Sequence, residues 1–140
     1  MEATSPTEDR DAVEFVLRLA RALHSYGTPS HQIEDALQGI ARRLGKSAQF
    51  LATPTSIMIS VGPQYSERIH LLRVEPGEQD LGKLSDVFEV ANAVVRGDVS
   101  PAEGSSRLEA IDRALPRYRG LVVILAMGLS SAAASRFLGG

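Results

Sequence analysis

The chain has 140 residues, 44% of them hydrophobic and 23% charged, a balance typical of a globular chain long enough for one core. Its formal net charge is -2, and it has no block of Lys and Arg interleaved with aromatic residues, which argues against nucleic-acid binding. Because the chain contains no cysteine, it can form neither disulfides nor thiolate metal sites, and a reducing compartment fits it.

The N-terminal residues 1–11 are polar and acidic, and they lack the basic start and apolar core of a secretory signal. We therefore expect residues 1–11 to form a flexible acidic arm in the cytoplasm. From Val13 onward, apolar residues recur at helical spacing. They predict a first helix that ends near Ser25, with Gly27 as its stop.

A second amphipathic helix is predicted by apolar residues that recur at helical spacing from Ile33 to Leu44. Gly45 is expected to end it. The sequence before it allows two starts. Either Thr28 caps the helix with Pro29 at its first position, or Ser30 is the cap.

Three short strands are predicted after this helix, in residues 49–52, 56–61 and 68–74. In the middle strand Ile57, Ile59 and Val61 alternate with polar or flexible residues, so the period changes to two. Gly62 interrupts that run, and the following residues predict a hairpin with the third strand.

Two further helices are predicted, one capped by Asp80 and ending at Gly97, the other opened by Ser100-Pro101-Ala102-Glu103 and ended by Pro116. The order of elements favours an α+β domain over a wound parallel sheet. We expect two helices, a small antiparallel sheet of about three strands and two further helices in residues 12–116, then an apolar C-terminal helix.

Residues 117–140 differ from the rest, because residues 121–135 carry no charge. This stretch is too short to span a bilayer, which takes about 20 apolar residues, and we expect it to be the start of the first transmembrane segment of a longer protein. Arg113, Arg117 and Arg119 precede it, which predicts an inner-membrane protein with residues 1–119 in the cytoplasm. The alternative is a C-terminal helix buried in the core of a soluble domain.

The chain resembles the N-terminal domain of the threonine/serine exporter family from about Val13 onward. The motifs that carry the resemblance are Arg21-Ala22-Leu23, Tyr26-Gly27-Thr28-Pro29-Ser30-His31-Gln32-Ile33-Glu34-Asp35, Ala52-Thr53-Pro54-Thr55-Ser56-Ile57, Arg73-Val74 and Asp80-Leu81-Gly82-Lys83-Leu84. The resemblance implies a cytoplasmic domain followed by several transmembrane helices that export threonine and serine by secondary transport. Some family members work with a partner membrane subunit and are associated with dicarboxylate export.

The resemblance also nominates a substrate-binding pocket, because five residues match motif positions of the family: Ser30, His31, Glu34, Thr55 and Arg73. Each has a structural alternative. Ser30 caps a helix, Glu34 lies near the positive end of that helix, and Arg73 forms an ion pair with Asp80 or Glu34. His31 has no third ligand at metal-binding spacing, and adjacent Ser30 and His31 are poorly placed as nucleophile and base.

We therefore expect a transporter component and not an enzyme, with no catalytic residue, metal or cofactor. The expected partners are threonine, serine or a dicarboxylate as substrate, the membrane, and either further transporter helices or a partner membrane subunit. A homo-oligomer is a further alternative. Three other functions stay open: a soluble regulatory domain that binds a small carboxylate, a dicarboxylate exporter subunit, and a hydrolase-like domain.

Overall fold

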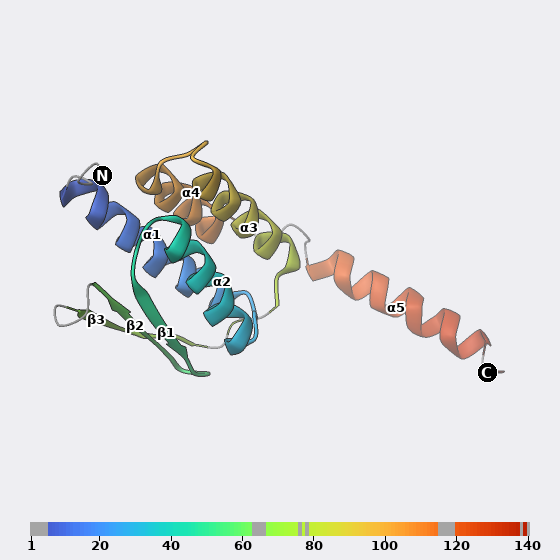
Figure 1. The fold of residues 1–140 in the computed structure, drawn as a ribbon. Coiled ribbons are helices and arrows are strands. Elements are labelled where there is room, and N and C mark those ends of the chain that lie inside the picture. The colour runs from blue at the N-terminus through green and yellow to red at the C-terminus, as the bar shows by residue number, and fades with distance from the viewer. Residues whose placement is uncertain are drawn as a thin grey trace.

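The computed structural model describes residues 6–62, 67–75, 77, 79–114, 120–137 and 139. The described part has the predicted α+β arrangement, with two helices, a small sheet, two helices and a last helix in chain order (Figure 1). The elements are α1 (Pro6–Ser25), α2 (Ser30–Arg43), β1 (Ala48–Ala52), β2 (Ser56–Val61), β3 (Arg68–Arg73), α3 (Leu81–Arg96), α4 (Pro101–Arg113) and α5 (Gly120–Phe137).

Helix α1 lies at the centre of the folded region and packs against α2, α3, α4 and β2. Phe15, Leu19 and Leu23 recur at helical spacing, and their side chains are completely buried. The helix begins at Pro6, earlier than Val13, where the apolar pattern starts. Its first turn is polar and exposed, so apolar periodicity could not signal it.

Helix α2 begins at Ser30 and ends at Arg43, close to the predicted bounds, but both predicted caps are wrong. Pro29 is the N-cap residue, and no side chain caps the helix. The Pro29 carbonyl accepts hydrogen bonds from the backbone N–H groups of Gln32 and Ile33, at 3.0 and 3.1 Å. The side-chain oxygen of Thr28 is buried without a hydrogen-bond partner among the described residues.

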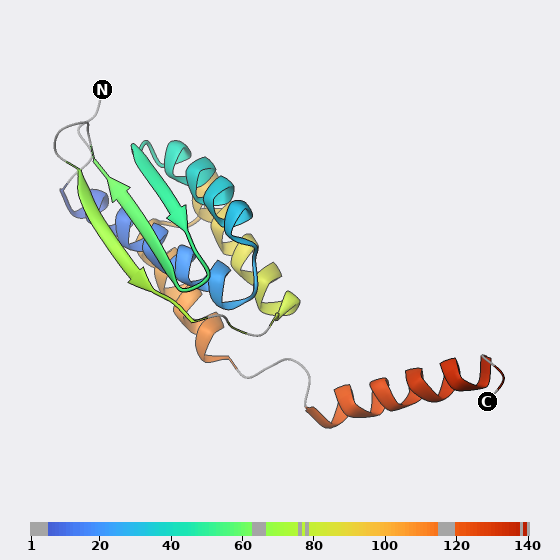
Figure 2. The same ribbon diagram turned by 90° about the horizontal axis from the view of Figure 1, so that it is seen from below.

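The sheet is antiparallel in the order β1-β2-β3, which confirms the predicted hairpin. Its inner face is covered by α1 and α2 (Figure 2). Ile57 and Ile59 of β2 point to that face and are completely buried, as the alternating pattern predicted. The outer face, turned toward the viewer in Figure 2, carries exposed apolar side chains.

Helices α3 and α4 begin and end near the predicted residues because their end signals are local. The Asp80 side chain accepts a hydrogen bond from the Lys83 N–H at 3.0 Å, and Gly97 ends α3 with a φ of 80°. The Ser100 hydroxyl caps α4 by accepting from the Glu103 N–H at 3.2 Å. Helix α4 ends at Arg113. The predicted stop at Pro116 lies outside the described residues.

Helix α5 projects away from the folded region (Figure 1). Its apolar side chains from Ile124 onward are exposed, Leu129 by 71%. The alternative of a C-terminal helix buried in the core is therefore wrong. Within the described residues, no helix combines the length and the apolar character that crossing a membrane requires.

Candidate functional site

The turn between β1 and β2 contains one of the motifs singled out in the sequence, and its hydroxyl groups bond within the turn. The Thr53 hydroxyl accepts a hydrogen bond from the Ser56 N–H at 3.0 Å, and its oxygen lies 2.8 Å from the Ser56 hydroxyl oxygen. The Thr53 N–H donates to the Ser56 carbonyl at 2.8 Å. These two side chains therefore close the turn around Pro54.

Glu34 joins α2 to this turn. Its Oε1 atom accepts a hydrogen bond of 2.7 Å from the Ala52 N–H, at the last residue of β1. A charged acceptor makes this bond stronger than an ordinary backbone contact. Glu34 thus connects the first turns of α2 to the sheet.

The five nominated residues are only partly brought together. Glu34 and Thr55 lie near the same end of the sheet, and the Val74 N–H beside Arg73 donates to the Thr55 carbonyl at 3.1 Å. Ser30 and His31 stand at the start of α2, one turn before Glu34. No hydrogen bond or ion pair between two of these five side chains occurs in the described part of the chain, so a shared pocket stays a prediction.

Arg73 lies on the outer face of the sheet, opposite Ser56, and its side chain is exposed. The structure therefore contradicts the alternative in which Arg73 faces inward and pairs with Asp80 or Glu34. Among the residues described, neither carboxylate forms an ion pair with Arg73. Glu34 instead bonds to the sheet backbone, and Asp80 caps α3.

A polar cluster that the sequence did not nominate lies where α1, α3 and α4 meet. The Tyr26 hydroxyl donates to Oδ1 of Asp112 at 3.1 Å. Lys83 Nζ donates to the Asp112 carbonyl at 3.0 Å and lies 5.6 Å from the centroid of the Tyr26 ring, within the range of a cation–π contact. We call Tyr26, Lys83 and Asp112 the junction cluster.

The junction cluster keeps the Tyr26 phenol protonated. Burial raises the pKa of Tyr26 from 10.0 to about 12, and the hydrogen bond and charge of Asp112, with the charge of Asp80, act in the same direction. Tyr26 therefore acts as a hydrogen-bond donor and not as a proton-transfer group near neutral pH. Only its position, an aromatic residue with a polar tip just before Gly27, could have indicated this role from the sequence.

The segment before α3 packs closely against the turn between α1 and α2. A Cβ atom on Gly77 would lie 1.9 Å from the carbonyl oxygen of Ser25, and one on Gly27 would lie 2.6 Å from Cγ of Gln79. Gly27 also has a φ of 83°, which favours glycine. This close packing holds the junction cluster at the end of the folded region where α4 leads toward α5.

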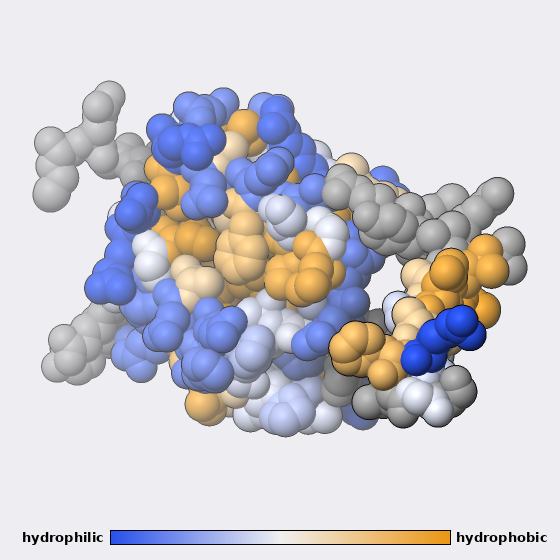
Figure 3. Space-filling view, turned by 90° about the vertical axis from the view of Figure 1, so that its right-hand side faces the viewer, coloured by the Kyte–Doolittle hydropathy of each residue, from blue (hydrophilic) through white to orange (hydrophobic). Residues whose placement is uncertain are grey.

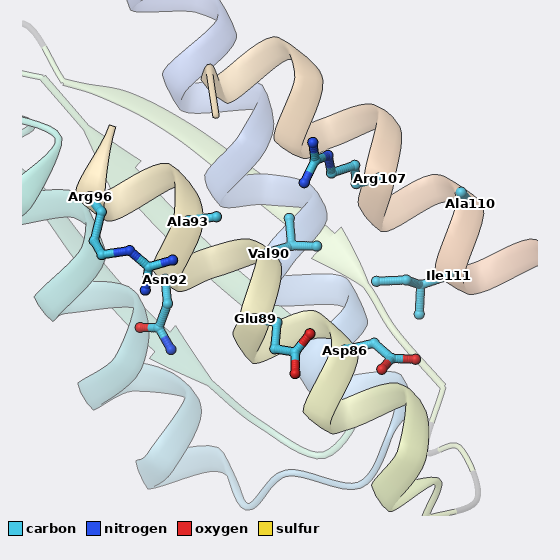
Figure 4. A pocket seen from close by; sticks show the side chains of 9 residues that line it. All are labelled: Asp86, Glu89, Val90, Asn92, Ala93, Arg96, Arg107, Ala110 and Ile111. Atoms are coloured by element: carbon cyan, nitrogen blue, oxygen red, sulfur yellow. The ribbon is translucent and has the colours of Figure 1, made fainter. Parts of the chain in front are cut away.

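A pocket of about 580 Å³ opens along the seam between α3 and α4 (Figure 4). Arg96 and Arg107 line it, as do Asp86 and Glu89, which lie nearer the start of α3. Val90 and Ile111 contribute apolar surface between them. Arg107 Nη2 lies 2.6 Å from Glu103 Oε1 and Arg96 Nε lies 2.8 Å from Asp98 Oδ2, which leaves other guanidinium N–H groups for a ligand.

A second surface feature lies over α2 and α3. Hydrophobic residues gather in the middle of this face, and hydrophilic residues surround them (Figure 3). Phe88 of α3 is 39% exposed, while Leu84 of α3 and Ile40 of α2 are partly buried against the core.

Comparison with known proteins identifies relatives of this chain. A family model described as "Putative threonine/serine exporter" matches residues 14–140. The chain is 31% identical over 121 residues to an uncharacterised protein of Schizosaccharomyces pombe, covering 85% of this chain and 16% of that protein. Pheromone-regulated membrane protein 10 of Candida albicans is 28% identical over 125 residues, which cover 88% of this chain and 11% of that protein.

The same-named protein of Yarrowia lipolytica is 34% identical over 106 residues, which cover 74% of this chain and 9% of that protein. The chain therefore spans about a sixth or less of the length of these relatives. No solved structure matches it.

Proposed function

Because the chain belongs to the threonine/serine exporter family, we propose that residues 6–114 are the water-exposed domain of a membrane exporter for small polar solutes. The family resemblance expected from the sequence motifs is confirmed by the match over residues 14–140. The proposed role of this domain is to bind the solute and to influence the membrane part through α5.

The proposal depends mainly on helix α5, which is apolar and projects away from the folded region. Residues 120–135 are uncharged, and Ile124, Leu125 and Met127 are exposed by 68%, 59% and 69%. A contiguous apolar surface of this kind marks contact with lipid or with other protein. Relatives that are named as membrane proteins support lipid or membrane helices as that environment.

In this proposal α5 begins the membrane part of an inner-membrane protein, and residues 1–119 face the cytoplasm. Arg113, Arg117 and Arg119 precede the apolar stretch in sequence, and basic residues beside a membrane segment favour the cytoplasmic side. Residues 6–11, the first residues of α1, are proposed to belong to this domain but to lie outside the solute site.

Cell fractionation tests the role of α5. Wild-type chain should remain with membranes after a high-salt wash, whereas an Ile124→Lys/Leu129→Lys variant should move to the soluble fraction, because each lysine is costly to place in lipid. A matched variant, Gln32→Lys/Gln49→Lys, adds the same charge at exposed positions of the folded region. Equal release of the two double variants would contradict the proposal.

The charge pattern of the pocket between α3 and α4 favours an amino acid over a dicarboxylate. Arg96 and Arg107 could hold a carboxylate, while Asp86 and Glu89 could hold an ammonium group, so unlike charges are offered to one small molecule. A dicarboxylate would place one of its negative groups near the acidic residues. We therefore propose a zwitterion of the threonine or serine class as the ligand.

Titration calorimetry with L-threonine, L-serine and succinate tests this choice. Heat of binding is expected for the two amino acids, and Arg107→Gln should weaken binding about tenfold or more. Arg113→Gln is the matched control, since Arg113 also pairs with a glutamate four residues earlier on α4 but does not line the pocket. Stronger binding of succinate, or equal effects of the two variants, would overturn the assignment.

A further inference from the structure

Among the residues that the structure describes, strand β3 pairs with one strand only, so it forms an edge of the sheet, and it carries exposed apolar side chains. In the strand order β1-β2-β3 it has one neighbour, and in Figure 2 it is the outermost strand. Ile69 and Leu71 are exposed by 69% and 67%. Residues 68–73 contain no proline, and their charged side chains, Arg68 and Arg73, stand only at the two ends of the strand, so its middle lacks these protections of an edge strand.

The hydrogen-bond pattern shows which β3 residues have free backbone groups. The Val74 N–H donates to the Thr55 carbonyl, so these two residues form a hydrogen-bonded pair of the β2–β3 ladder. Hydrogen-bonded pairs alternate along an antiparallel ladder, so the N–H and C=O groups of Ile69, Leu71 and Arg73 point to the free edge. The side chains of the same three residues lie on the outer face.

From these observations we propose that two copies of the chain pair through β3 in an antiparallel fashion, giving a continuous six-stranded sheet. Only residues with free backbone groups can form hydrogen-bonded pairs across the new ladder, which limits the register. Pairing Ile69 with Leu71 of the second copy also places Glu67 opposite the second copy's Arg73. The two neighbouring registers that keep the hydrogen bonds place Arg73 opposite Ile69, or Glu67 opposite Leu71.

Charge and apolar complementarity therefore select one register. Opposite charges directly across a ladder are favourable, and so are two apolar side chains. In this register the outer faces join, so Leu51 and Met58, exposed by 56% and 42%, become part of one apolar surface that crosses both copies. No other register places unlike charges at both ends of the new ladder.

The inner side of β3 leaves room for the second copy. A hollow of about 480 Å³ lies beside Leu72, between α1 and α4. In the selected register the second copy's Arg68 stands opposite Leu72, at this hollow. Glu14 and Glu109 line the hollow together with Arg18, which lies 2.9 Å from Glu14 Oε1 and 3.4 Å from Glu109 Oε2, so the hollow offers the incoming arginine space and not excess negative charge.

The two-fold axis of this dimer passes between the two copies of His70, which form a pair without hydrogen bonds. Such pairs have Cα atoms about 4.5 Å apart, a separation that a disulfide can bridge. Because the chain has no cysteine, a His70→Cys variant carries one thiol per copy. Mild oxidation in a non-ionic detergent should convert most of it to a disulfide-linked dimer, visible on a non-reducing gel.

Gln49→Cys is the matched control, because Gln49 is exposed on the other edge strand and lies far from the proposed axis. It should give little dimer under the same oxidation. If circular dichroism shows that His70→Cys does not fold, the double variant Ile69→Cys/Leu71→Cys replaces it. In the proposed register, residue 69 of each copy lies opposite residue 71 of the other copy, so this variant offers two cross-links. Cross-linking of the β3 variants that is no greater than that of Gln49→Cys would overturn the proposal.

A charge exchange in the His70→Cys background tests the register. Arg73→Glu alone and Glu67→Arg alone should each reduce the initial rate of cross-linking about fivefold or more, because each creates two like-charge pairs. The double exchange should restore the rate, because the unlike pairs return with their signs reversed. Failure of the double variant to recover would overturn the pairing of Glu67 with Arg73.

Discussion

The Tyr26 hydroxyl donates a 3.1 Å hydrogen bond to Asp112, a residue 86 positions later in the chain. This contact connects the residue that follows α1 to the last turn of α4. In the sequence, that turn directly precedes the segment between α4 and α5. Lys83 at the start of α3 bonds to the Asp112 backbone, so three helix ends are held together. Separating the last turn of α4 from Tyr26 and Lys83 would break both hydrogen bonds of this cluster.

Tyr26→Phe should lower the free energy of unfolding by about 1 kcal/mol, because it removes the hydrogen bond but keeps the ring. Asp112→Asn should have a smaller effect, since the amide oxygen can still accept. Urea unfolding followed by circular dichroism measures both. A loss in Asp112→Asn as large as that in Tyr26→Phe would show that the charge of Asp112 matters more than its acceptor atom.

The raised pKa of Tyr26 predicts a pH dependence of stability. Between pH 10.0 and about 12 the unfolded chain loses the phenol proton while the folded chain keeps it. The contribution of Tyr26 to the free energy of unfolding should therefore be complete below pH 10, and it should decrease as the pH rises toward 12. Subtracting the profile of Tyr26→Phe isolates this contribution from other groups, and parallel profiles would contradict it.

Two glycines inside helices should respond oppositely to alanine. A Cβ atom on Gly104 of α4 would lie 2.5 Å from Cγ2 of Val94 and 2.8 Å from Cε2 of Phe15, whereas one on Gly39 of α2 meets nothing within 4 Å. Gly104→Ala should cost about 1–3 kcal/mol through overpacking, and Gly39→Ala should add about 0.5–1 kcal/mol through helix propensity. Thermal unfolding of the two variants checks both signs, and equal shifts would contradict the close helix crossing.

Local signals explain what the sequence could predict. Asp80, Ser100 and Gly97 act on their own neighbours, so the bounds of α3 and α4 follow from a few adjacent residues. The alternation in β2 likewise reports its buried face directly. The junction cluster and the pocket between α3 and α4 depend on side chains that only the packed helices bring together, and no spacing in the sequence records such contacts.

The start of α2 shows the limit of cap signals. Thr28 and Ser30 both have the side-chain chemistry of a cap, but the backbone of Pro29 is extended and takes that place. The family motifs group Glu34, Thr55 and Arg73 as three of the predicted site residues. The structure places them at one end of the sheet, yet Glu34 bonds to the backbone while the other two are exposed.

The link between Glu34 and β1 should contribute to stability. Glu34→Ala should lower the free energy of unfolding by about 1–2 kcal/mol, because the Ala52 N–H loses its charged acceptor. Glu34→Gln keeps an acceptor and should lose less. Asp35→Ala, at the exposed neighbouring position, should change the value by no more than about 0.5 kcal/mol. Similar losses in Glu34→Ala and Asp35→Ala would contradict the structural role.

The two phenylalanines of the helical layer should separate core packing from surface contact. Phe15 is completely buried, and its ring fills the space that a Cβ atom on Gly104 would need, so Phe15→Ala should cost about 3–5 kcal/mol. Phe88 is 39% exposed on the face formed by α2 and α3, so Phe88→Ala should cost about 1 kcal/mol or less in the isolated chain. Chemical denaturation gives both values. A large loss for Phe88→Ala would mean that the hydrophobic residues of this face belong to the core, whereas a small one leaves their side chains accessible to whatever contacts α2 and α3.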